Sequence, residues 1–165
     1  MLNFLHAEKK TKEHEKCFVY SPVKGHVFPI EEISDEAFSK HMLGDGFAVN
    51  PVSNQIVSPV NGKITAVFPT NHAIAITAEN GTEILIHIGI DTVNLNGSFF
   101  HSLARMKQKV VVGMPLIMVE FAKIAEKGYE IPVIVVVTNL NEGYKIQKNI
   151  DAFDNEPVLE IERGE

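Results

Sequence analysis

The sequence predicts an all-β protein, an antiparallel β-sandwich with one or two short helices. From Phe18 onward, short β-branched and apolar stretches alternate with glycine, proline and asparagine, a pattern typical of strands joined by tight turns. A weak internal repeat indicates two similar units, because Ser-Pro-Val-Lys-Gly at 21–25 recurs as Ser-Pro-Val-Asn-Gly at 58–62, each followed by Phe-Pro. The strongest local signal is Asn80-Gly81, which predicts a hairpin between residues 73–77 and 83–88.

Later strands are expected where apolar β-branched residues gather between turn residues, at 110–112, 115–120, 133–138 and 158–161. The stretch 99–107 fits either a helical turn or an irregular link.

One short helix is predicted after Ser34, which can cap its first turn. Asp35 and Glu36 suit a helix start, and Gly44 can end the segment. Phe38 and Met42 would then lie on one face of this helix.

Composition narrows the functional classes. A formal net charge of −6 and a pI near 5.6 argue against a nucleic-acid binder. The longest apolar run, 132–137, is too short to span a bilayer, and no signal-peptide pattern opens the chain, so we expect a cytoplasmic protein. The single cysteine, Cys17, precedes an apolar stretch and is interpreted as a small buried hydrophobe.

The N-terminal residues differ in character from the rest. Residues 1–16 are heavily charged and have no periodic apolar face, so they predict a mobile extension before a single domain over 17–165. Leu2, Phe4 and Leu5 offer too little apolar area for a stable helix at a membrane surface.

Two histidines flank the predicted hairpin. With a two-residue turn at 80–81, His72 faces Gly89, and His87 lies two residues further along that strand. The two imidazoles would then be diagonal neighbours on one face, about 7–8 Å apart at the backbone. A slip of one residue would send them to opposite faces.

This pair suggests transient phosphorylation of a histidine. Neutral imidazole is a nucleophile at cellular pH, and a second imidazole can donate a hydrogen bond to the phosphoryl oxygens. The surrounding residues resemble the glucose-family IIA component of the bacterial phosphoenolpyruvate-dependent sugar phosphotransferase system. The resemblance runs from about Val19 to Asn139 and rests on Thr70-Asn71-His72-Ala73, on His87-Ile88-Gly89-Ile90-Asp91-Thr92-Val93, and on the segments 21–25, 43–46, 58–62 and 109–113.

The resemblance implies a barrel-sandwich hybrid fold related to biotinyl and lipoyl domains, and no cofactor. It implies that His87 is phosphorylated on Nε2 while the Gly89 carbonyl holds its Nδ1–H. His72 would stabilise the phosphoryl group, and the Thr70 hydroxyl would orient His72. The donor would be the histidine-containing phosphocarrier protein HPr, and the acceptor a cysteine of a IIB domain of a sugar permease.

The resemblance also implies a docking surface. Asp91 and Asp35 match carboxylates that face an arginine of HPr, although each also suits a solvated surface charge. Apolar positions that ring the histidines in the family correspond here to Phe38, Leu43, Phe68 and Ile88, any of which also suits the core. Partner specificity is left open by departures from the family pattern at Pro69, Phe99 and Gly113-Met114.

Two other functions compete with phosphotransfer. The spacing of His41 and Asp45 resembles a motif of barrel-sandwich zinc peptidases, which need three protein ligands at the metal. A further alternative is a non-enzymatic zinc site, in which His72 and His87 share the metal with a partner protein. Met106-Lys107 imitates the lysine of a biotin or lipoyl carrier, but that interpretation leaves both histidines unexplained.

Overall fold

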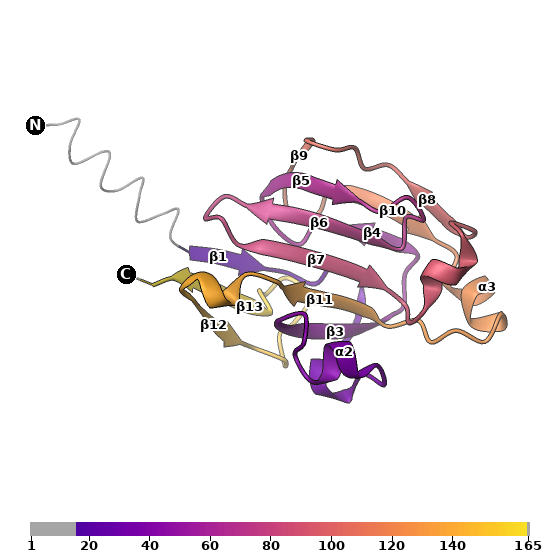
Figure 1. Cartoon of the computed structure of the whole chain (residues 1–165), viewed down its shortest axis with the longest axis horizontal. Helices are drawn as coiled ribbons and strands as arrows, with labels where there is room; N and C mark the ends of the chain where they lie inside the picture. The colour runs from indigo at the N-terminus through magenta and orange to yellow at the C-terminus, as the bar shows by residue number, and fades with distance from the viewer. Residues whose placement is uncertain (1–15, 165) are drawn as a thin grey trace, which may run out of the picture.

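A seven-stranded antiparallel sheet forms the centre of the fold (Figure 1). The computed structural model describes residues 16–164. In sheet order, the strands are β2 (Gly25–Pro29), β3 (Asp45–Pro51), β11 (Val133–Val137), β7 (Glu83–Ile88), β6 (Ala73–Ala78), β5 (Gly62–Val67) and β9 (Lys109–Val110). The expectation of an antiparallel β fold with few helices is confirmed, because every strand pair in this sheet is antiparallel.

Two three-stranded sheets complete the fold. One contains β4 (Gln55–Val57), β10 (Pro115–Val119) and β8 (Phe100–Ser102), so the undecided stretch at 99–107 begins with a strand. The other contains β1 (Lys16–Val19), β13 (Leu159–Arg163) and β12 (Tyr144–Lys148). Lys16 pairs with Glu162, so it begins a strand and does not belong to the predicted extension; the rest of that extension lies outside the described residues.

The core explains the sequence pattern of the central strands. β6 and β7 alternate because one face packs into the main apolar cluster, which includes Ile74, Ile76, Ile84, Ile86 and Ile88. β11 is buried at all five positions, because its other face contributes Ile134 and Val136 to a second apolar cluster. The main core therefore lies on one side of the large sheet, and a smaller core lies on the other.

The second cluster is covered by residues 31–43, here called the strap. The strap contains the end of the 3-10 helix η1 (Ile30–Glu32) and all of α2 (Glu36–Ser39), and it contributes buried Ile33 and Phe38. Its backbone hydrogen bonds all end within residues 30–44, so within the described chain no backbone bond joins the strap to a strand.

The predicted helix in the strap differs in detail from α2. Asp35 caps it by accepting the Ala37 N–H at 2.9 Å, so Ser34 is not the cap. The helix ends at Ser39, and Met42 beyond it is 72% exposed, so Met42 does not share a buried face with Phe38. The error arises because Ser34 and Asp35 are both good capping residues, and tertiary contacts select between them.

Three further elements connect strands, namely α3 (Phe121–Glu126), η2 (Thr92–Leu95) and η3 (Leu140–Glu142). Within residues 16–164, no helix has the length and apolar character needed to cross a membrane.

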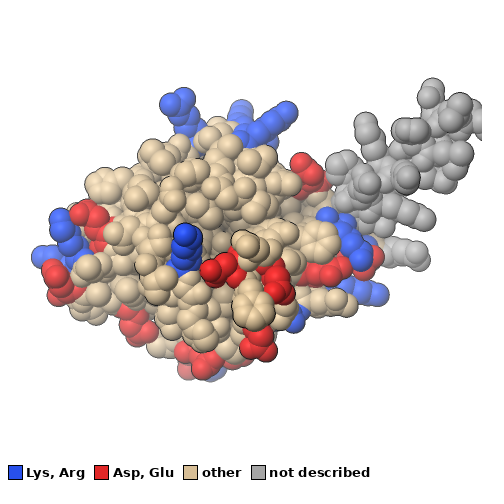
Figure 2. Space-filling model, turned by 180° about the vertical axis from the view of Figure 1, so that it is seen from behind, with Lys and Arg blue, Asp and Glu red and all other residues tan. Residues whose placement is uncertain are grey.

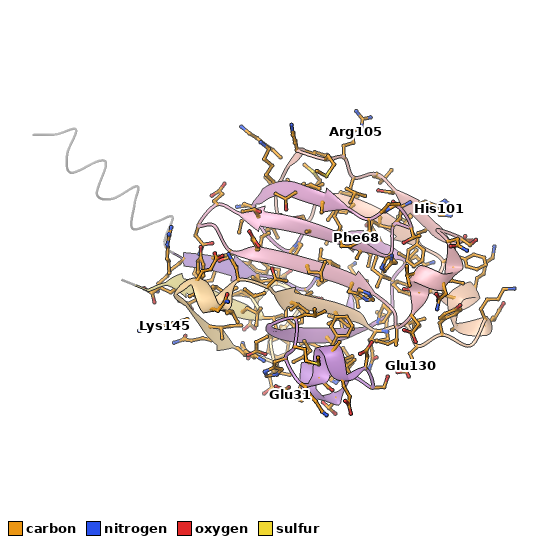
Figure 3. The ribbon with its side chains drawn as sticks, viewed as in Figure 1. Glu31, Phe68, His101, Arg105, Glu130 and Lys145 are labelled. Carbon is orange, nitrogen blue, oxygen red and sulfur yellow. The ribbon has the colours of Figure 1, made fainter. Side chains whose placement is uncertain are left out.

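Charge is unevenly distributed over the surface. Seen from behind, Lys and Arg stand along the upper edge without neighbouring Asp or Glu (Figure 2), where β9 is the edge strand of the large sheet. Lys63 and Lys109 face each other there, and Arg105 lies on the loop that leads into β9 (Figure 3). Charged edges of this kind discourage pairing with a strand of another molecule.

Candidate active site

The hairpin that carries the histidines has a three-residue turn. Ala78 N–H donates to the Thr82 carbonyl at 2.8 Å, and Gly81 adopts a left-handed φ of 91°. Ala73 therefore pairs with His87, and His72 lies beside Ile88, whose N–H donates to the His72 carbonyl at 2.8 Å. The predicted register, with His72 opposite Gly89, is wrong by one residue.

The two imidazoles nevertheless meet. Their ring centroids are 5.1 Å apart and the ring planes stand at 83°, an edge-to-face arrangement. The slip in register does not separate them, because β6 begins at Ala73 and the backbone before it is not extended: Asn71 has a φ of 57°. Strict alternation of side chains stops at the strand end, so His72 can turn toward the face that carries His87.

His87 lies under the strap. The Phe38 ring packs against it, with centroids 5.0 Å apart and a tilt of 56°. Burial, followed by the charge of His72, lowers the pKa of His87 to about 4, although Gly89, Asp35 and Asp91 act in the opposite direction. His87 is therefore neutral at neutral pH.

The two ring nitrogens of His87 are in different surroundings. Nδ1 is buried, and no hydrogen bond of good geometry joins it to the Gly89 carbonyl, although the Gly89 backbone is near enough to favour the protonated ring. The expected hydrogen bond from His87 Nδ1–H to the Gly89 carbonyl is therefore not formed with good geometry. Nε2 is the nitrogen that remains available to a partner.

His72 is held from behind by Thr70. The Thr70 Oγ1 forms a short hydrogen bond with Nδ1 of His72, and the Phe68 ring lies edge-on at 5.7 Å between centroids. Burial lowers the pKa of His72. If the Thr70 hydroxyl donates, Nδ1 accepts and the ring proton is on Nε2, so neutral His72 has a donor at that nitrogen.

A glycine turn follows His87. Gly89 has a φ of 75°, and a Cβ there would lie 2.5 Å from Thr92 Cγ2 and 3.0 Å from the Glu130 carbonyl oxygen. The turn is held by N–H groups of Gly89 and Ile90, which donate to the carbonyls of Pro132 at 2.8 Å and Glu130 at 3.0 Å. This turn leads directly to Asp91, which is exposed next to the site.

Comparison with known proteins places this geometry in a family. The family model described as "phosphoenolpyruvate-dependent sugar phosphotransferase system, EIIA 1" matches residues 17–143. The chain belongs to this family. It is 40% identical over 138 residues to the glucose-specific EIIA component of Staphylococcus epidermidis, an alignment that covers 83% of each chain.

Two further relatives are consistent with membership of this family. The beta-glucoside-specific EIIBCA component of Bacillus subtilis is 42% identical over 149 residues, which are 90% of this chain but 23% of that protein. The solved structure of glucose permease IIA from Mycoplasma capricolum matches with a TM-score of 0.77 at 37% identity, covering 88% of this chain and 95% of that one. As a member of the EIIA family, the protein is a phosphotransferase component of a sugar phosphotransferase system.

The predicted rim of this EIIA site is assembled only in part. Phe68 and Leu43 are 39% and 44% exposed, while Phe38 is buried against His87. Ile88 is fully buried in the main core, on the other face of β7, so it does not contribute to a surface rim. Asp35 and Asp91 are both close enough to act on the His87 charge, as expected for carboxylates beside the site.

The residues of the competing zinc motif lie elsewhere. Among residues 16–164, the group with ligand atoms close enough to hold a metal is Glu31, His41 and Asp45, without either histidine of the pair. His41 Nε2 lies 2.9 Å from Glu31, and the Lys148 ammonium already pairs with Asp45. The expected spacing therefore does not supply a third zinc ligand to His72 and His87.

One residue near the site carries no signal in the sequence. Glu130 precedes β11, and its carboxylate accepts the Ser34 hydroxyl at 2.9 and 3.1 Å across 96 positions of the chain (Figure 3). Such a contact depends on tertiary structure alone.

Proposed function

We propose that this protein accepts a phosphoryl group from phospho-HPr on His87 and passes it to a cysteine of a IIB domain, acting in the cytoplasm. The observation that carries the proposal is the edge-to-face pair of His72 and His87, found in a chain of the EIIA family.

His87 is the nucleophile in this proposal. Its Nε2 lone pair attacks phosphorus, a new P–N bond forms, and the bond to the donor imidazole breaks with its electron pair returning to the donor nitrogen. Attack needs an unprotonated ring, and the pKa of about 4 keeps His87 unprotonated at neutral pH. In the second step a cysteine thiolate attacks phosphorus, and the electron pair of the P–N bond returns to His87.

His72 and Thr70 support the charge that develops during transfer. The Nε2–H of His72 donates a hydrogen bond to a phosphoryl oxygen, and Thr70 fixes the ring that provides it. No metal or cofactor is needed for this sequence of steps.

The partner is held around the histidines. Phe68 and Leu43 supply exposed apolar surface, and Phe38 limits the access of water to His87. Asp35 and Asp91 supply negative charge for a cationic side chain of HPr.

Reconstituted phosphotransfer tests the proposal. The protein is incubated with phosphoenolpyruvate, enzyme I and HPr, and acid-labile phosphate is mapped by mass spectrometry. We expect one phosphoryl group on His87, none in His87→Ala, and normal labelling in His26→Ala, which removes an exposed histidine of β2. Label on His72 or on another histidine would refute the assignment, and failure to label an added IIB cysteine would refute the second step.

A further inference from the structure

The chain runs from β2 into the strap and from the strap into β3, and between these two connections side chains alone hydrogen-bond the strap to the rest of the described protein. Within the described chain, its backbone hydrogen bonds are local, and its apolar anchors are Ile33 and Phe38 in the second cluster. At its far end, Glu31 and His41 meet Asp45 and Lys148 of the neighbouring strands. At the end near His87, among residues 16–164, the polar link is the Ser34–Glu130 pair, and Glu130 lies in the segment just before β11.

Glu130 occupies a central position in this arrangement. Its backbone carbonyl accepts the Ile90 N–H, and so holds the turn that follows His87. Its carboxylate accepts the Ser34 hydroxyl from the residue just before Asp35. A single residue thus ties the strap to the segment that fixes His87.

We propose that Glu130 is a positioning residue for phosphoryl transfer, which sets the strap against His87 through its hydrogen bond with Ser34. The proposal rests on the proposed function, and it assigns Glu130 no contact with the phosphoryl group. Its effect passes through Asp35, the residue next to Ser34, and through Phe38, whose ring packs on His87.

The expected consequences concern docking and shielding. Loss of the link lets the near end of the strap move, so Asp35 is held less well for a partner and Phe38 covers His87 less closely. The Ser34–Glu130 bond joins exposed side chains, so we expect its loss to raise the KM for phospho-HPr by about two- to threefold, near the lower limit for a single hydrogen bond. Because burial is the main cause of the low pKa of His87, looser packing also raises that pKa toward its ordinary value.

Three variants separate the hydrogen bond from the charge. Ser34→Ala and Glu130→Ala both remove the bond, whereas Glu130→Gln removes the charge but keeps an amide oxygen that accepts the Ser34 hydroxyl. Glu126→Ala is the matched control, because Glu126 is an exposed glutamate at the end of α3. Each variant is assayed for KM and kcat with phospho-HPr, and its His87 ring is titrated by NMR.

We expect both alanine variants to raise the KM for phospho-HPr and the His87 pKa, and a variant that combines Ser34→Ala with Glu130→Ala to show no larger effect than either alone. Both Glu130→Gln and Glu126→Ala should resemble the parent protein. If all variants have the same KM and the same His87 pKa as the parent protein, the proposal is overturned. A defect in Glu130→Gln as large as in Glu130→Ala also overturns it, because charge and not the link would then matter. If the parent protein accepts no phosphate, the proposed function fails, while the NMR titration still tests the link.

Discussion

Acidification should destabilise the protein through His87. The pKa of its imidazole falls from 6.5 to about 4 on folding. Between these two pH values the ring is therefore protonated in the unfolded chain but mostly unprotonated in the native protein. The free energy of unfolding therefore rises with pH between about 4 and 6.5, and this contribution is lost as the pH falls through that range. The full depression corresponds to about 3 kcal/mol, of which about 2 kcal/mol should already be lost at pH 5.

Urea unfolding of the parent protein and of His87→Gln at pH 7 and pH 5 measures this contribution. Titrating groups common to both proteins cancel in the difference between them, so the stability of the parent should fall relative to the variant by about 2 kcal/mol on going to pH 5. NMR titration of the His87 ring gives an independent value. The reasoning is refuted if the difference between the proteins is the same at both pH values, or if it changes in the opposite direction.

Four further predictions concern the site. His72→Gln should still accept phosphate at His87 but transfer it onward about 10²–10³ more slowly, since one positioned donor is altered; stopped-flow transfer at the parental rate would make His72 a bystander. Asp91→Asn should slow acceptance from phospho-HPr at low salt and flatten its salt dependence, because exposed charges are screened over about 8 Å at physiological ionic strength; an unchanged salt profile would place the electrostatic contact elsewhere. Gly89→Ala should lower the free energy of unfolding by about 1–3 kcal/mol, because a Cβ there meets Thr92 at 2.5 Å with a positive φ; parental stability in urea would contradict this. EDTA should leave phosphate acceptance intact, and a loss of activity restored by zinc would favour a metal-dependent reaction.

The class of fold and the proximity of the two histidines follow from the sequence, but the predicted two-residue turn between β6 and β7 is wrong. Asn80-Gly81 suits a two-residue turn, yet Gly81 equally suits the left-handed position of a three-residue turn, which the structure contains. The histidines still meet because Asn71 breaks the strand just before His72. The type of a turn and the exact end of a strand are thus set by tertiary contacts as well as by the local sequence.

Contacts between distant segments were beyond prediction. Local chemistry favours Ser34 as a helix cap, but its hydroxyl donates to the Glu130 carboxylate. Ile88 matched a family position near the histidines, but alternation along β7 places it in the core. The roles of His87, His72 and Thr70 stay predictions, which the phosphotransfer assay tests.

The pairing of β1 with β13 has a consequence for how such a unit is built into larger proteins. Because the two strands are antiparallel, the start of β1 and the end of β13 lie side by side at one end of the domain. His87 lies near the arrowhead of β7, at the opposite end (Figure 1). A linker at either strand therefore need not cross the histidines. An acceptor tethered at either strand has to reach the opposite end of the domain. A linker too short for that span gives no effective concentration at the site, and a much longer one dilutes it. The length of such a linker is thus one factor in the preference of His87 for a tethered acceptor over a free one.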